Sequence, residues 1–354
     1  MKNWFQSLVI DGVSYSREEL LHDVVPSLIQ SEEAWRHSIG EFIAQWLDET
    51  ESIMVKTSGS TGEPKLISVS KQAMVLSAQK TIRFFGLAPR TRALLCLPAS
   101  YIAGRMMLVR AFVGQWDLHF VQPNDLPEAL GDDSVFDMAA LVPLQLEQLL
   151  AAGFNFSRIK TIIVGGAPCS NALRGSLAGS NIWETYGMTE TVSHIGLRKM
   201  GEAWFRPLED VFLSLDTRGC LCIDAPGITD CRLVTNDVVE LQPDGRFRFL
   251  GRADHVINSG GIKHFPEELE KKLAVCLEVP FVILGLPDAL LGEKIVLVVE
   301  ADVVDEVDIL EKLKALLDKY EIPKAVMALN PFPHTGNGKI DRPAIRRCLL
   351  EKMG

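Results

Sequence analysis

The chain has 354 residues, of which 36 are Lys or Arg and 46 are Asp or Glu, so its formal net charge is −10 at pH 7. This acidic balance argues against nucleic acid as the main partner, because nucleic-acid binding needs an excess of positive charge. Hydrophobic residues make up 47% and charged residues 23%, which are proportions of a globular protein of two or three domains. No apolar run approaches the ~18 residues of a membrane-spanning helix, so we expect no membrane partner.

The N-terminal sequence and the cysteines both predict a cytoplasmic protein. The start of the chain is interrupted at Asp11 before a signal-peptide core forms, and no small-residue cleavage site follows. Seven cysteines, an odd number scattered along the chain, are better explained as reduced thiols than as a disulfide framework. Cys220 and Cys222 share one face of a predicted strand, but no His or fourth Cys completes a metal site with them and Cys231.

The first predicted elements are two short helices, followed by an α/β pattern. Ser16 and Glu19 have the spacing of a capping box, and residues 31–33 open an amphipathic helix that runs towards Trp46. From Ile53 onward apolar runs alternate with amphipathic segments, which is typical of a parallel sheet covered by helices. The predicted helices include 105–113 and 144–151, and the strands are 92–97, 117–121, 138–142 and 161–164.

The pattern changes after Glu209, where hairpin turns at 216–219 and 243–245 separate short strands at 211–215, 220–223, 237–242 and 247–250. After Gly251 the sequence predicts helices at 266–277 and 307–320 and strands at 282–286 and 294–299. We therefore predict an α/β fold with a large N-terminal α/β domain, residues 1–251, that includes a small antiparallel β subdomain at about 209–251. Residues 252–354 would form a small C-terminal α+β domain.

A loop rich in hydroxyl groups lies between the predicted strands 53–55 and 66–69. It contains two glycines, four hydroxyl side chains and a lysine, namely Thr57, Ser58, Gly59, Ser60, Thr61, Gly62 and Lys65. Its backbone N–H groups, hydroxyls and ammonium group are the donors that polyphosphate oxygens need. The loop is not a Walker A loop, because the spacing from glycine to lysine differs and no Ser or Thr follows the lysine. A flexible hairpin loop is the alternative interpretation.

Four segments, in the same order along the chain, resemble motifs of the adenylate-forming superfamily of acyl-CoA synthetases, peptide-synthetase adenylation domains and luciferases. They are the loop 57–65, the stretch 184–190, the stretch from Thr235 to Gly261, and residues 335–339. The resemblance implies that a carboxylate attacks the α-phosphate of ATP to give an acyl-adenylate, and that the thiol of CoA then displaces AMP. It also implies that the C-terminal domain is mobile and swings about Asp254 between these two steps.

The resemblance implies a role for each motif residue. Lys339 would bridge the carboxylate and the phosphate, Thr189 would donate its hydroxyl to the α-phosphate, and Glu190 would hold Mg²⁺. Asp237 would accept both ribose hydroxyls, because one carboxylate can take two such donors. Tyr186 would lie on the adenine ring, although without the motif a packed core residue would be the more common interpretation.

Further nucleotide contacts follow from the same resemblance. The glycine-rich stretch after strand 161–164 would let adenine approach the backbone, Arg252 would hold the ribose or a phosphate, and a later pair of glycines would line the path of the CoA thiol. The residues of these three groups and of the segment beside Tyr186 are Gly165, Gly166, Ala167, Pro168, Gly187, Met188, Arg252, Gly260 and Gly261.

Within the superfamily the chain is most similar to the o-succinylbenzoate–CoA ligases of menaquinone biosynthesis, on the stretches 186–195 and 97–107. Recognition of o-succinylbenzoate requires an aromatic slot and a counter-charge for the carboxylate that is not activated. Arg105 is the candidate counter-charge, because a guanidinium suits a carboxylate, and a solvated helix arginine is the alternative. The other substrate candidates are Tyr101, Gly104, Ser193 and His194.

The sequence departs from the superfamily pattern in its length before the phosphate loop, which is only some fifty residues. A homodimer is one arrangement that would cover the flank of a shortened N-terminal part. Two alternatives stay open: another aryl- or acyl-CoA ligase, and a nucleotide-binding relative with impaired catalysis. The retained lysines and acids of the four motifs argue against the second.

Overall fold

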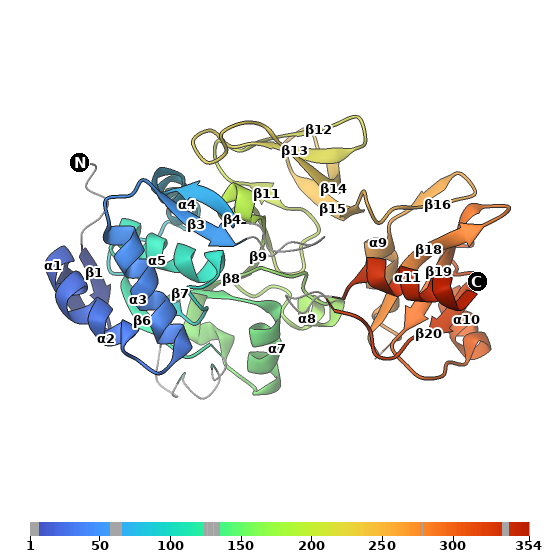
Figure 1. The fold of residues 1–354 in the computed structure, drawn as a ribbon, viewed down its shortest axis with the longest axis horizontal. Helices are drawn as coiled ribbons and strands as arrows, with labels where there is room; N and C mark the ends of the chain where they lie inside the picture. Colours follow the sequence, from blue (N-terminus) through green and yellow to red (C-terminus); the bar gives the residue numbers. More distant parts are fainter. Residues whose placement is uncertain are drawn as a thin grey trace.

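The computed structural model describes residues 7–56, 66–123, 126, 130, 135–277, 279–334 and 340–353. Figure 1 shows the N-terminal part on the left, an antiparallel sheet at the top and the C-terminal part on the right. The predicted phosphate loop 57–65 and the lysine motif 335–339 lie outside the described residues. Within the described ranges no helix is long and apolar enough to cross a bilayer.

A nine-stranded sheet forms the centre of the N-terminal part, in the order β11-β10-β9-β8-β7-β5-β6-β1-β2. The strands from β9 to β1 along this order are parallel, which confirms the fold predicted from the alternating pattern. At one edge of the sheet β2 is antiparallel to β1. At the other edge β10 is antiparallel to β9 and β11 is antiparallel to β10. The bounds are β1 Ser7–Ile10, β2 Val13–Ser16, β5 Arg92–Leu95, β6 Asp117–Phe120, β7 Phe136–Leu141, β8 Ile159–Val164, β9 Ile182–Gly187, β10 His194–Lys199 and β11 Arg206–Pro207.

Helices cover both faces of this sheet. Successive residues of a strand point to opposite sides, so each strand contributes apolar side chains to both layers. In β8, Ile163 belongs to the larger hydrophobic cluster, whereas Ile162 and Val164 belong to the cluster on the other face. The larger cluster includes buried residues of α3 (Ala34–Leu47), α4 (Lys71–Phe85) and α5 (Ile102–Gly114). The other includes residues of α7 (Pro143–Ala151) and α8 (Asn171–Ser176).

The N-terminal helices and the hairpin that flanks the phosphate loop agree with the sequence. The predicted capping box is confirmed, because the Ser16 N–H donates to Glu19 Oε2 at 2.7 Å and the Glu19 N–H donates to Ser16 Oγ at 3.3 Å. This box opens the run α1 (Arg17–Glu19), η1 (Leu20–Val24) and α2 (Val25–Ile29). The antiparallel pair β3 (Ser52–Lys56) and β4 (Leu66–Ser70) confirms the two strands on either side of the loop.

The predicted antiparallel sheet after residue 209 is also confirmed, with β12 (Phe212–Leu215), β13 (Cys220–Asp224), β14 (Leu233–Leu241) and β15 (Phe247–Arg252) as neighbours in that order. Strand β14 begins four residues before the predicted start at 237. The reason is that Leu233 and Val234 pair with β13. Asp237 therefore lies within a strand, opposite Arg252 of β15, and not at the start of one.

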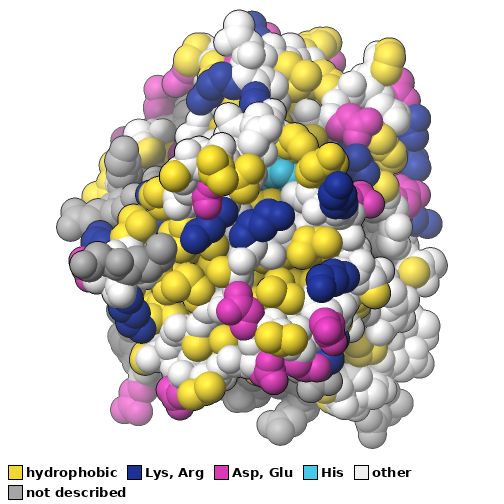
Figure 2. Space-filling view, turned by 90° about the vertical axis from the view of Figure 1, so that its right-hand side faces the viewer, with side chains coloured by type: hydrophobic (Ala, Val, Ile, Leu, Met, Phe, Trp, Pro, Cys, Tyr) yellow, Lys and Arg dark blue, Asp and Glu magenta, His cyan; other side chains and the backbone are white. Residues whose placement is uncertain are grey.

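The C-terminal part has a sheet of its own, in which β17, β16, β19 and β18 are consecutive neighbours and β20 pairs with β19. Its strands are β16 (Ile257–Ser259), β17 (Ile262–His264), β18 (Phe281–Asp288), β19 (Gly292–Val299) and β20 (Ala325–Ala328), and its helices are α9 (Pro266–Leu273), α10 (Glu306–Lys314) and α11 (Arg342–Met353). Helices α9 and α10 end earlier than predicted, and β16, β17, β20 and α11 were not predicted. Figure 2 shows basic, acidic and apolar side chains interspersed over this end of the molecule.

The hydrophobic clusters separate the C-terminal part from the rest of the chain. Two clusters draw their buried residues from positions 8–247, and two others draw theirs from positions 257–349. A division between independent cores is what defines a domain. We therefore propose the boundary between residues 251 and 252 that the sequence predicted.

Candidate active site

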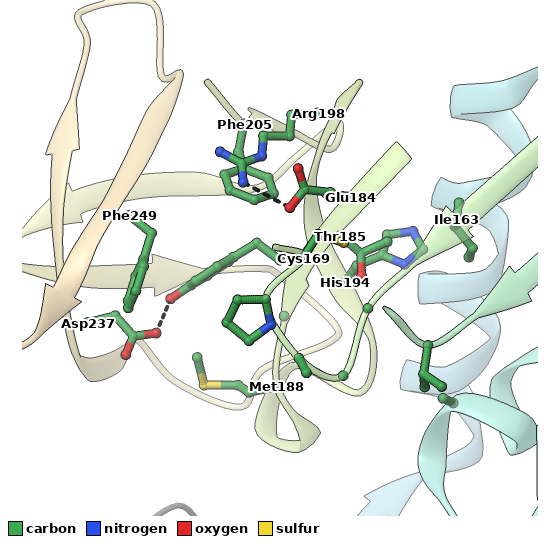
Figure 3. A pocket seen from close by; sticks show the side chains of 18 of the residues that line it. Ile163, Cys169, Glu184, Thr185, Met188, His194, Arg198, Phe205, Asp237 and Phe249 are labelled. Atoms are coloured by element: carbon green, nitrogen blue, oxygen red, sulfur yellow. Dashed lines mark hydrogen bonds and ion pairs between the residues drawn. The ribbon is translucent and has the colours of Figure 1, made fainter. Parts of the chain in front are cut away.

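A cavity of about 1360 Å³ opens where the parallel strands β7, β8 and β9 end, and residues of the C-terminal part complete its wall. Ligands of open α/β sheets bind at the carboxyl ends of the strands. Figure 3 shows Asp237 and Phe249 on one side of this cavity and His194 and Ile163 on the other. We call these two sides the Asp237 end and the His194 end. The volume exceeds the ~300–1000 Å³ of an ordinary small-molecule pocket, so two substrates can be held together.

Glycines keep part of the cavity wall flat. Gly165, Gly166, Ala167 and Pro168 all line the cavity, directly after β8. A Cβ atom at Gly165 would lie 2.2 Å from Thr185 Oγ1, and Gly166 has a φ of +84°. Side chains would fill this edge, so the glycines leave bare backbone that a planar ring can approach.

The Asp237 end combines an aromatic ring with a buried carboxylate. The Tyr186 hydroxyl donates to Asp237 Oδ2 at 2.5 Å, and the Tyr186 ring meets Phe247 edge to face at 5.0 Å between centroids. Burial raises the pKa of Asp237, and burial together with the Asp237 charge raises the pKa of Tyr186 well above its usual value. The sequence predicted both residues as nucleotide contacts, and the structure brings them together.

Arg252 and Asp254 are engaged with each other. Arg252 donates from Nε and Nη2 to the two carboxylate oxygens of Asp254 at 2.9 and 3.0 Å, and its Nη1 lies 3.5 Å from Asp237 Oδ1. Burial opposes ionisation of Asp254, but the bond from Arg252 outweighs it and lowers the Asp254 pKa. Arg252 lines the cavity, whereas Asp254 and the predicted thiol-path residues Gly260 and Gly261 are not among the described residues that line it.

The loop between β9 and β10 carries three more predicted residues. Met188, Thr189 and Glu190 line the cavity, in and just before the short 3-10 helix η3 (Thr189–Thr191). Thr189 is buried and Glu190 is exposed. Magnesium is often held by one or two carboxylates plus phosphate oxygens, so an exposed Glu190 at the cavity fits that ion. Among the described residues no three His, Cys, Asp or Glu side chains form a cluster that could hold a metal by themselves.

The His194 end contains a buried arginine. Arg110 of α5 lines the cavity and is only 2% exposed, and burial lowers its pKa to about 10. Its guanidinium donates to Ser193 Oγ at 2.7 Å, to Thr81 Oγ1 at 3.4 Å and to Met107 Sδ at 3.6 Å. None of these partners is charged, and Arg110 forms no ion pair with any residue that the structure describes. An uncompensated buried cation favours an anionic ligand.

The structure does not support the predicted role of Arg105. This arginine donates to the backbone carbonyls of Ala99 and Met54, both at 2.8 Å, and it does not line the cavity. Tyr101 is 65% exposed and Gly104 packs where a Cβ would lie 2.3 Å from the Pro98 carbonyl oxygen, so neither lines the cavity. The sequence analysis missed Arg110. Its signal was a lone cation within the apolar run of residues 106–113.

Glu184 and two arginines form a second charged group that the sequence analysis missed. Arg174 donates to both carboxylate oxygens of Glu184, at 2.8 and 2.7 Å, and Arg198 donates at 2.9 Å. Burial opposes ionisation, but these bonds prevail and lower the Glu184 pKa. Each of these arginines has Glu184 as a charged partner, so the group stabilises the cavity wall, and Arg110 is the cation of the described lining that has no carboxylate partner.

His194 is held as a neutral ring. Its Nε2 lies 3.1 Å from Thr81 Oγ1, and burial, together with the Arg110 charge, lowers its pKa well below the usual value. His194 in the unfolded chain therefore binds a proton with a pKa near 6.5, and His194 in the native chain stays unprotonated at that pH. Because the unfolded state binds more protons, the free energy of unfolding rises with pH below about pH 6.5. We expect this slope, about 1.4 kcal/mol per pH unit, to be lost in His194→Gln. Urea unfolding at pH 5.5 and 7.5 measures it, and equal slopes in both proteins would refute the assignment.

The C-terminal part contributes the outer wall. Glu267, Glu270, Lys271 and Arg342 line the cavity, and the Asn171 side chain of α8 donates to the Lys271 carbonyl at 2.6 Å. In Figure 1 helix α9 faces β15, whereas the β16–β17 hairpin points away from the N-terminal part. The loop residues 57–65 and Lys339 lie outside the described residues, so their predicted phosphate contacts stay predictions.

Comparison with known proteins adds independent findings. A family model described as "AMP-binding enzyme" matches residues 9–211, more than half of the chain. A 2-succinylbenzoate–CoA ligase of Listeria monocytogenes is 26% identical over 96% of this chain and 76% of that protein, and a probable one of Mycobacterium tuberculosis is 27% identical over 86% of each.

Solved structures are similar as well. An acyl-CoA synthetase (AMP-forming)/AMP-acid ligase II-like protein from Dyadobacter fermentans is 33% identical, with a TM-score of 0.60 over 93% of this chain and 97% of that one. The o-succinylbenzoate–CoA synthetase of Bacillus subtilis is 22% identical, with a TM-score of 0.73 over 84% of this chain and 68% of that one. The family match, the shared fold and the cavity lead to one conclusion: the chain belongs to the AMP-binding enzymes and is an adenylate-forming acyl-CoA ligase.

Proposed function

We propose that the protein activates o-succinylbenzoate with ATP and transfers the acyl group to CoA. The observation that carries this proposal is Arg110, a buried cation without a charged partner among the described residues, at one end of the cavity. An acid with one carboxylate would have to leave Arg110 unpaired when that carboxylate reacts. A dicarboxylic acid can bind Arg110 with one carboxylate and present the other for activation.

The surroundings of Arg110 also suit an aromatic acid. On the face of the sheet that α5 covers, four apolar residues line the cavity: Leu97, Ile102, Ile163 and Val192. These side chains offer an apolar slot, and Ser193 and Thr81 hold the guanidinium in place. An aromatic ring with an ortho carboxylate matches a slot that has one cation at its end.

In the first step one oxygen of the substrate's succinyl carboxylate forms a bond to the α-phosphorus of ATP. The bond from that phosphorus to the bridging oxygen breaks, and pyrophosphate leaves. Tyr186 and Asp237 would orient the adenosine, and Thr189, Lys65 and Lys339 would offset the repulsion between the two anions. Mg²⁺, held by Glu190, would neutralise phosphate charge when bound.

In the second step the sulfur of CoA forms a bond to the acyl carbon, and the bond from that carbon to the phosphate oxygen breaks to release AMP. The thiol gives up its proton in this step, which near neutral pH needs little help from a base. We propose that the C-terminal part turns about Asp254 before this step, so that Gly260 and Gly261 replace the Lys339 segment beside the acyl group.

A matched pair of acids tests the proposal. o-Succinylbenzoate and 4-oxo-4-phenylbutanoate share the activated chain and the ring, and differ only in the ring carboxylate. We expect CoA-dependent release of AMP with a kcat/KM about 100-fold or more higher for o-succinylbenzoate, because loss of the second carboxylate leaves Arg110 buried and unpaired.

Benzoate and a medium-chain fatty acid are assayed beside this pair and complete a panel of four acids. Faster turnover of either would identify another aryl- or acyl-CoA ligase and refute the proposed substrate. Absence of ATP–pyrophosphate exchange with every acid would favour a nucleotide-binding relative with impaired catalysis.

A further inference from the structure

The loop that joins β9 to β10 contains an unusual backbone turn at Val192. This residue has a φ of +66° and a ψ of −50°, and the Ser193 N–H donates to the Thr191 carbonyl oxygen at 2.7 Å. The angles and the bond between residues two apart define a γ-turn of the rare, strained kind. A β-branched residue in this region of backbone space is an outlier, because its Cβ crowds the neighbouring carbonyl.

The surrounding contacts hold the turn in place. The buried Thr191 hydroxyl accepts a hydrogen bond from the Met188 N–H at 3.0 Å and donates one to the Ser193 carbonyl oxygen at 2.8 Å. On the other side, a Cβ at Gly187 would lie 2.4 Å from the Ser193 carbonyl oxygen and 2.5 Å from His194 Cα. The turn is thus pressed against the end of β9, and this packing opposes relaxation of Val192.

The turn lies at the cavity wall. Val192, Ser193 and His194 are consecutive, and all three line the cavity. The reversal of the backbone at Val192 joins η3 to β10 and thereby sets where Ser193 and His194 lie. The Val192 side chain, 2% exposed, packs in the larger hydrophobic cluster, and the Ser193 hydroxyl accepts from Arg110.

We propose that Val192 is a positioning residue, whose strained turn holds Ser193 and His194 beside Arg110 and thereby fixes the shape and polarity of the acyl pocket. This inference rests on the proposed function, because it assigns the His194 end of the cavity to the acid. Strain at such a turn is retained because the turn aims side chains, so a residue that adopts the turn without strain should raise stability and keep recognition of the acid.

A pair of variants separates the turn from the side chain. Val192→Ala and Val192→Gly both remove the isopropyl group, but only glycine accepts a positive φ without strain. We expect the glycine variant to melt roughly 2–4 °C above the alanine variant. Val109, buried in the middle of α5, is the matched control, and there the order should be reversed because glycine weakens a helix.

The activity of the same pair gives the decisive result. We expect the KM for o-succinylbenzoate to be about tenfold higher in Val192→Ala than in Val192→Gly, because glycine adopts the turn without strain, whereas alanine keeps the strain and loses the packing that holds Ser193 on Arg110. The KM for ATP should agree within about twofold between the two variants. The more stable variant would then also be the better enzyme.

Two results would overturn the inference: equal KM values for the acid in both variants, which would assign the role to the side chain alone, or a higher melting temperature for Val192→Ala. If another acid of the panel proves to be the substrate, the same comparison applies to that acid. If the wild-type chain releases no AMP with any acid, the proposed function has failed, and the melting order still supports or overturns the strained turn.

Discussion

Replacing Arg110 by methionine is expected to lower kcat/KM for o-succinylbenzoate by about 100- to 1000-fold, because a buried, hydrogen-bonded charge pair is worth roughly 3–4 kcal/mol when one partner is removed. The KM for ATP should hardly change, since Arg110 binds Ser193, the neighbour of His194, whereas Asp237 lies on the other side of the cavity from His194 (Figure 3). The discrimination against 4-oxo-4-phenylbutanoate should disappear at the same time. Steady-state release of AMP measures all three quantities.

Arg105→Met is the matched control for this variant. Arg105 is on the same helix, but its guanidinium binds the Ala99 and Met54 carbonyls outside the cavity. We expect this variant to lose some stability and to keep its preference for o-succinylbenzoate. Arg110→Met should melt at the wild-type temperature or above it, because methionine removes an uncompensated buried charge. A loss of discrimination in Arg105→Met alone would restore the prediction made from the sequence.

Asp237→Asn is expected to raise the KM for ATP by about 30- to 100-fold, because each of the two ribose hydrogen bonds would contribute roughly 1.5–3 kcal/mol with a charged acceptor and only about 1 kcal/mol with a neutral one. Asparagine keeps the shape of the side chain and can still accept from Tyr186. Its neutral amide also avoids the burial cost that raises the pKa of Asp237, so the melting temperature without ATP should not fall. The KM for the acid should stay unchanged.

The control for this variant is Asp244→Asn, in the turn between β14 and β15. Asp244 is exposed, binds Arg246 at 2.7 Å and is not among the described residues that line the cavity. It should leave both KM values at the wild-type level. Equal ATP affinity in Asp237→Asn and in the wild type would show that the ribose is held elsewhere, and the nucleotide assignment of the Asp237 end would fail.

Much of the fold could be predicted because its signals are local. The parallel sheet was predictable from apolar runs such as 161–164, which are buried on both faces. The antiparallel sheet was predictable from turn sequences such as 216–219. Strands β9 and β10 were missed because they carry motif residues, including Glu184 and His194, whose polar side chains hide the apolar pattern.

The site was predictable only where a motif carried it. Tyr186 and Asp237 were found from short segments, and their hydrogen bond joins residues 51 positions apart. Arg105 was preferred over Arg110 because both lie on the same predicted helix, and a helix of this composition is apolar all round, so periodicity does not indicate which side faces the cavity. Packing of α5 against the sheet decides this, and packing is a property of the whole fold.

The division of the cavity wall between the two parts of the chain has an evolutionary consequence. The groups around Arg110 that would recognise the acid, Ile163, Val192 and His194 among them, all come from before residue 200, whereas Glu267, Lys271 and Arg342 belong to the C-terminal part. If the proposed function holds, substrate choice belongs to the N-terminal part and the proposed turning movement to the C-terminal part, and the two would be separable. A hybrid in which the last hundred residues come from a relative should keep the acid preference of this chain. Its kcat should resemble that of the relative.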